Sequence, residues 1–228
     1  MNRRTILMLV LLLWGSAPAL AQQRPLQTED PETIGAGRIL IEAGVDYKTD
    51  VYYPLSGLRG DLFAVPTMGL SIGVSSIAEI QIDGGFYQKL SISERVPGAL
   101  FSSALDFEGD TTSDVEDLHI GAKIRFLSET AGRPAMAARF STRLPNASNE
   151  SGLGKDMQDF GAWLAFGKTI QSVRIVGNIG MLILGNPTKP AAQDDLLAYN
   201  LSIARAISGS TEIVGEFVGL CGMTNCRN

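Results

Sequence analysis

Few residues in this chain could do chemistry, and their spacing argues against an enzyme. His119 is the only histidine, so a Ser-His-acid or Cys-His arrangement would have to use it. Apolar and polar residues alternate around it, which places His119 on the polar face of a strand, where we expect it to form hydrogen bonds. We therefore predict no catalytic residues. A membrane-embedded enzyme that depends on His119 is the alternative.

Metal and nucleotide sites are equally poorly supported. Cys221 and Cys226 are the only cysteines, and with one histidine they cannot supply the four ligands of a Cys/His zinc site. They form either a local disulfide or two free thiols. The glycine-lysine stretch 152–156 lacks the spacing and the Ser/Thr of a phosphate-binding loop, and no βαβ unit follows the glycines at 35–37. We expect no metal and no cofactor.

Charged side chains recur on the polar side of several alternating segments, which suggests that they share one face of a sheet. The acidic residues of this set belong to the first and third segments and the basic residues to the fourth, fifth and seventh. The candidates are Glu42, Asp46, Glu79, Asp83, His119, Lys123, Arg125, Arg139, Arg143 and Arg174.

The elements that position these residues are strands, because apolar residues recur with period two and not 3.6. The alternation covers about nine segments: 38–47, 61–73, 78–87, 117–126, 136–144, 160–166, 173–183, 197–203 and 213–217. Many are longer than the usual strand of about 5 to 6 residues and suit the roughly 9 to 11 that cross a bilayer.

The predicted connections alternate in length. Those at 74–77, 128–134, 168–171 and 207–210 are short, and those at 47–59, 89–114, 145–158 and 185–194 are long. This is the expected asymmetry of outer-membrane barrels. We predict an all-β fold in which residues 38–220 form an antiparallel up-and-down transmembrane β-barrel with an apolar face towards lipid. The candidate charges would then face the lumen, where they create a transverse field for polar solutes or pair with one another and fill a small barrel.

An odd strand count conflicts with closure, because all backbone groups in hydrocarbon must be paired and bacterial single-chain barrels have even counts. At least one strand is therefore expected to be missing. Residues 221–228 read as an irregular tail. Either the carboxyl terminus is truncated or frame-shifted, or one strand has been miscounted.

The amino terminus reads as an export signal. Arg3 and Arg4 precede an apolar run at 6–14, and Ala19-Leu20-Ala21 fits a cleavage site, so residues 1–21 are predicted to be a signal peptide. The apolar run is too short for a membrane anchor. Residues 22–37 are polar and contain proline and glycine, which predicts a flexible lead-in. Nineteen Lys and Arg against 24 Asp and Glu give a net charge of −5, which disfavours nucleic acid as a partner.

Several stretches point to a family. They are Asp117–Phe126, the run GRPAMA at 132–137, Arg143-Leu144-Pro145, Gly152-Leu153-Gly154 before Asp159-Phe160, Asn178-Ile179-Gly180 and Gly215-Glu216-Phe217. Together, over residues 35 to 219, the chain resembles the outer-membrane transporter-like family named for the meta-cleavage pathway of phenol degradation. The resemblance implies a β-barrel that passes hydrophobic or aromatic compounds, and it supplies no catalytic residues. The early end of this chain departs from the family pattern.

The leading prediction is a bacterial outer-membrane channel or transport-like barrel for the passive passage of small solutes, including hydrophobic or aromatic ones. Its expected partners are outer-membrane lipid, small solutes and the barrel-assembly machinery. The alternatives are a structural or surface-binding barrel with a plugged lumen, and a soluble periplasmic β-fold that binds an apolar ligand.

Overall fold

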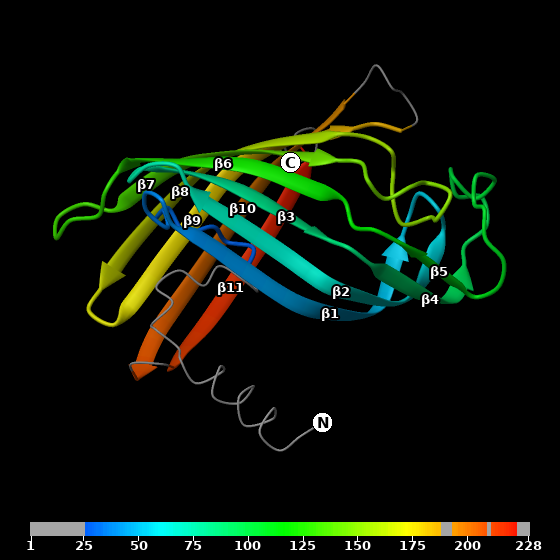
Figure 1. Cartoon of the computed structure of the whole chain (residues 1–228), viewed down its shortest axis with the longest axis horizontal. Coiled ribbons are helices and arrows are strands. Elements are labelled where there is room, and N and C mark those ends of the chain that lie inside the picture. Colours follow the sequence, from blue (N-terminus) through cyan, green and yellow to red (C-terminus); the bar gives the residue numbers. More distant parts are fainter. Residues whose placement is uncertain (1–25, 188–192, 209–210, 223–228) are drawn as a thin grey trace.

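The computed structural model describes residues 26–187, 193–208 and 211–222, which form one antiparallel sheet (Figure 1). The all-β antiparallel prediction is confirmed. In this part of the chain, no helix is long and apolar enough to cross a membrane. The strands are β1 (Ile39–Tyr53), β2 (Leu58–Gly73), β3 (Ala78–Gly85), β4 (Gln88–Arg95), β5 (Thr111–Asp114), β6 (Leu118–Leu127), β7 (Ala135–Leu144), β8 (Asp159–Ile170), β9 (Val173–Gly185), β10 (Gln193–Ser208) and β11 (Thr211–Gly222).

The eleven strands make nine passes, because two passes are each divided in two. β3 and β4 pair with the same edge of β2, with Gly85 opposite Thr67 and Gln88 opposite Ala64. β5 and β6 pair in the same way with β4 and β3. Each pass therefore lies beside the next one in sequence, as in an up-and-down meander, and each of the nine alternating segments overlaps one pass.

Two of the predicted long connections contain strand residues. β1 continues to Tyr53 and β2 begins at Leu58, so most of 47–59 is paired, and β4 and β5 occupy much of 89–114. The alternation of the sequence fails at the end of β1 because the register shifts between Lys48 and Val51, where Asp50 has a φ of +54°. A bulge of this kind moves the following side chains to the other face. The first connection, 54–57, is therefore as short as the second, 74–77, and the strict alternation fails there, whereas the connection at 96–110 is long.

The sheet is not closed into a barrel. β1 and β11 are the first and last passes, and within the described residues they do not pair with each other (Figure 1). The short strand β5 also pairs on one side only, with β4. With nine passes the first and last strands run in the same direction, so the antiparallel ladder of a regular barrel cannot join them. β11 extends to Gly222, and Cys221 within it is disulfide-bonded. Cys226 and the rest of the predicted tail lie outside the described residues, as does the predicted signal peptide.

The two faces of the sheet have opposite chemistry. The inner face, against which residues 26–37 lie, buries polar side chains, among them Lys123 at 0% and Glu79 at 1% exposure. The outer face exposes large apolar side chains such as Phe126 at 55% and Leu164 at 43%. The largest buried apolar side chains gather in a small cluster that includes Leu58, and buried alanines such as Ala137 and Ala165 lie elsewhere in the sheet. Among the described residues, the buried set is therefore divided almost evenly, with eleven apolar and twelve polar or charged side chains.

Candidate functional site

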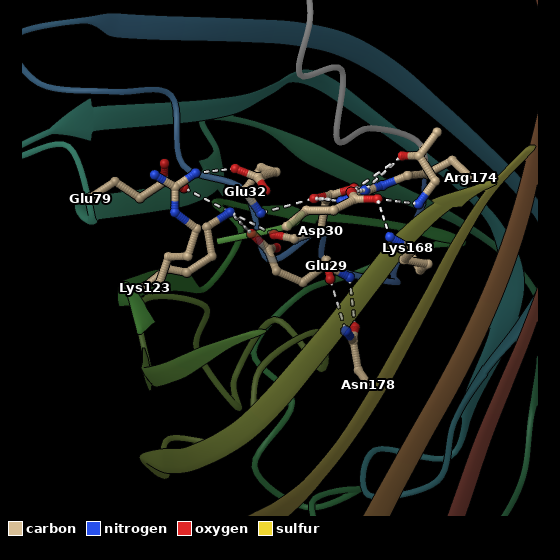
Figure 2. Close-up of polar contacts among 11 residues, drawn as sticks. Glu29, Asp30, Glu32, Glu79, Lys123, Lys168, Arg174 and Asn178 are labelled. Carbon is tan, nitrogen blue, oxygen red and sulfur yellow. Dashed lines mark hydrogen bonds and ion pairs between the residues drawn. The ribbon is translucent and has the colours of Figure 1, made fainter. Parts of the chain in front are cut away.

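Residues 26–37, the N-terminal segment, cross the inner face from one outer strand towards the other. At the first end, the backbone N–H and the hydroxyl of Thr28 both donate to Glu216 of β11, each at 2.5 Å. Further along, the backbone N–H of Glu29 donates to Asn178 of β9 at 2.6 Å, and the Asn178 side chain donates back to the Glu29 carbonyl at 2.8 Å (Figure 2). The composition of this segment predicts a flexible lead-in, and that prediction did not include these hydrogen bonds to the sheet.

At the other end the segment turns into β1 beside the end of β2. The backbone N–H of Ile34 donates to the Glu79 carboxylate at 2.8 Å. Gly35 and Gly37 then take φ values of +90° and +69°, which other residues rarely adopt. The approach to β2 is close, since a Cβ on Gly73 would lie 1.8 Å from the Gly35 carbonyl oxygen. Glycine at this position lets the segment enter the inner face.

Lys123 on β6 is at the centre of the contacts (Figure 2). Its ammonium lies 2.8 Å from Glu29 and 3.0 Å from Glu79, and it donates to the Asp30 carbonyl at 2.9 Å. Both the Lys123 and the Glu79 side chains have no exposed surface. Burial alone would raise the pKa of Glu29, but the charges of Lys123 and Arg139 and the hydrogen bonds it accepts hold that pKa below its usual value. Glu29 is therefore held as a carboxylate.

Arg139 on β7 extends this network to an aromatic side chain. Its Nε donates to Gln81 at 2.7 Å and lies 3.8 Å from Glu29. Its guanidinium stacks over the ring of Trp163 at 5.3 Å. Two glycines make room for that ring, since a Cβ on Gly180 would lie 2.1 Å from the indole and a Cβ on Gly161 would lie 1.9 Å from it.

Two further cations contact acidic side chains of the segment. Arg174 on β9 makes a two-pronged contact with Asp30, at 2.8 and 3.0 Å, and also donates to Glu129 at 2.5 Å. Arg125 on β6 pairs with Glu32. We call the four cations that meet the segment, Lys123, Arg125, Arg139 and Arg174, the basic wall. Two N–H groups of a guanidinium can donate to the two oxygens of one carboxylate, and such paired hydrogen bonds are strong and directional.

A polar pocket of about 290 Å³ lies on the same face. Its lining includes Asp46, Asp83, His119 and Arg143, with no serine or cysteine among the lining residues. Arg143 bridges Asp117, at 3.1 Å, and Asp159. The pocket could hold a polar solute, and Thr67 is the hydroxyl side chain among its lining residues.

The structure thus places the predicted residues in two groups. Glu79, Lys123, Arg125, Arg139 and Arg174 meet at the N-terminal segment, whereas Asp46, Asp83, His119 and Arg143 meet at the polar pocket. Glu42 is half-buried on β1, opposite Gly69.

Sequence reasoning missed the partners of these cations. Glu29, Asp30 and Glu32 of the segment, and Asp117 and Asp159 of the sheet, form ion pairs with them. One signal in the sequence could have indicated these partners. Three of the four residues at 29–32 are acidic, and the later strands carry basic residues on their polar face.

Comparison with protein-family models and with curated proteins finds no match to this chain. Within the described residues, no group of three or more His, Cys, Asp and Glu side chains is placed to hold a metal ion. The functional argument therefore depends on the geometry of the sheet.

Proposed function

We propose that this protein is an outer-membrane β-barrel that passes small solutes through a polar lumen. The observation that carries the proposal is the inverted polarity of the sheet, which buries charged side chains on one face and exposes apolar ones on the other. Many large apolar side chains are at least 40% exposed, including Ile41, Phe140 and Phe217. In water such an extended apolar surface would be an aggregation hazard, whereas in a bilayer it is the surface that faces lipid.

Strand length supports the same proposal. β8, β9, β10 and β11 have 12, 13, 16 and 12 residues, enough for the roughly 9 to 11 that a tilted strand needs to cross the hydrocarbon. The proposal also requires the free edges of β1 and β11 to be paired in the membrane, because hydrocarbon offers no partner for backbone groups. Passage of hydrophobic or aromatic solutes is the part of the proposal that depends on the family resemblance.

The chain allows a matched test of membrane insertion. Leu164 in β8 and Leu100 in the loop 96–110 are almost equally exposed, at 43% and 46%. If the outer face meets lipid, Leu164→Arg costs about 2–4 kcal/mol near the bilayer midplane, and Leu100→Arg costs little. In a soluble fold both changes would be nearly neutral, because both side chains already contact water.

Outer-membrane fractionation with unheated and heated denaturing gels provides the measurement. Under the proposal the wild type and Leu100→Arg give a membrane-bound, heat-modifiable band, and Leu164→Arg loses it. Equal behaviour of the two variants, or release of the wild type by a carbonate wash, refutes the membrane assignment.

Two alternatives are separated by particular observations. A plugged barrel is favoured by the N-terminal segment, which occupies the inner face, and it would give no liposome swelling or conductance. A soluble fold with an internal apolar ligand is disfavoured. The apolar groove of about 550 Å³, lined by residues such as Phe140, Phe160 and Met181, lies on the outer face, whereas the pocket described on the inner face is polar.

A further inference from the structure

The contacts of the N-terminal segment resemble those of a bound anionic ligand. We infer that the basic wall is a binding site for small carboxylate solutes, which the N-terminal segment occupies as an internal competitor. The inference rests on the proposed function in one respect, that solutes reach the inner face.

The charges on the inner face require an anion at this place. Glu79 and Glu129 are the carboxylates that other parts of the chain supply to the four cations, through Lys123 and Arg174. The segment supplies three further carboxylates to the same cations, those of Glu29, Asp30 and Glu32. When the segment detaches, these cations lose its three carboxylates, so the freed wall favours another anion in their place.

The segment fills this need with carboxylates, and the geometry defines the ligand class. The Asp30 carboxylate takes two nitrogens of Arg174, and the Glu29 carboxylate lies between Lys123 and Arg139. Two carboxylates on adjacent residues therefore meet the wall side by side (Figure 2). A small dicarboxylate such as succinate carries the same groups without the backbone.

The N-terminal segment can also leave the inner face without disrupting the sheet. Residues 26–37 contain no strand that pairs with the sheet, and their contacts with it are individual hydrogen bonds and ion pairs. Such a segment can detach without breaking a strand ladder. Because a solute and the segment need the same cations, each excludes the other.

The first test uses the wild-type protein and the exchange of backbone amide hydrogens. The N–H groups of Thr28, Glu29 and Ile34 are protected by Glu216, Asn178 and Glu79. Succinate at ten times its Kd for the freed wall should speed their exchange about tenfold, because a competitor raises the detached population by the factor 1 + [L]/Kd. Sodium chloride at matched ionic strength should do much less.

The second test removes the competitor's charges. The triple variant combines Glu29→Gln, Asp30→Asn and Glu32→Gln. Its affinity for succinate, measured by calorimetry, should rise by about tenfold or more, since the wall is free for a larger fraction of the time. The matched control neutralises three acidic residues of the exposed loop 96–110, Asp106→Asn, Glu108→Gln and Asp110→Asn, and should bind as the wild type does.

Three outcomes overturn the inference: an equal effect of succinate and sodium chloride on exchange, tighter succinate binding in both variants, or displacement by inorganic phosphate and not by succinate. If the triple variant does not fold, the exchange test on the wild type still decides. Both tests work on detergent-solubilised protein and need no conductance, so their failure is distinct from failure of the membrane assignment, which the Leu164→Arg comparison reports.

Discussion

Replacing Lys123 by methionine should destabilise the protein more than any substitution of an exposed lysine. The ammonium of Lys123 is fully buried and lies 2.8 and 3.0 Å from two carboxylates, those of Glu29 and Glu79. At an effective dielectric constant of about 20, unit charges at these distances attract by roughly 6 kcal/mol per contact, which offsets the cost of removing them from water. Methionine keeps the length of the side chain and removes the charge, which leaves two buried carboxylates facing each other. We expect a loss of about 3–5 kcal/mol in the free energy of unfolding.

Urea unfolding in detergent or vesicles, followed by tryptophan fluorescence, measures this loss. The double variant Lys123→Met, Glu79→Gln should recover part of it, because the repulsion between the two carboxylates is gone. Lys48→Met is the matched control, since Lys48 has a 58% exposed side chain and a 3.7 Å contact with Asp46, and it should change stability by less than about 0.5 kcal/mol. If Lys123→Met costs under about 1 kcal/mol, or no more than Lys48→Met, the buried charge network does not contribute as argued.

Two further predictions concern the same face. Gly180→Ala should move the ring of Trp163 and change its fluorescence spectrum, because the new methyl would lie 2.1 Å from the indole. Gly215→Ala is the control, since Gly215 has open space around it, and it should leave the spectrum unchanged. Identical spectra for the two variants would contradict the packing. Trp163 is the only tryptophan in a protein that begins at Gln22, because the other one is Trp14. The pKa of Glu29 is lower in the folded protein than its ordinary value of 4.5. Its ionised side chain therefore stabilises the folded state fully above pH 4.5, and this contribution is lost as the pH falls through the lower folded-state pKa. The difference in urea midpoint between wild type and Glu29→Gln should therefore shrink below pH 4.5, and a difference independent of pH would refute the assignment.

The passes of the sheet could be predicted from the sequence because a strand with one apolar face leaves a local signal of period two. The same signal failed where the backbone is irregular. Asp50, with its positive φ, and the break at Phe86-Tyr87 change which face the following residues occupy, and no local pattern reports such a shift. For this reason the predicted connections at 47–59 and 89–114 were too long, and the structure leaves 54–57 and 96–110 between strands.

The docking of the N-terminal segment could not be predicted in this way. Its composition, with polar residues, proline and glycine, is that of a flexible lead-in. Its order comes from partners far away in sequence, such as Lys123, which is 94 residues from Glu29, and Arg174, which is 144 residues from Asp30. Contacts of this range depend on how neighbouring passes bring their side chains together.

By itself, the sequence determined the nine passes, their antiparallel order and the separation of apolar from charged residues, because these depend on local periodicity and on short connections. Only the tertiary structure decided that β1 and β11 remain apart and that the cations of the inner face meet carboxylates from the amino terminus. Those outcomes depend on the summed curvature and registers of nine passes and on the cost of burying charge without a partner. Neither quantity is encoded in any single stretch of the chain.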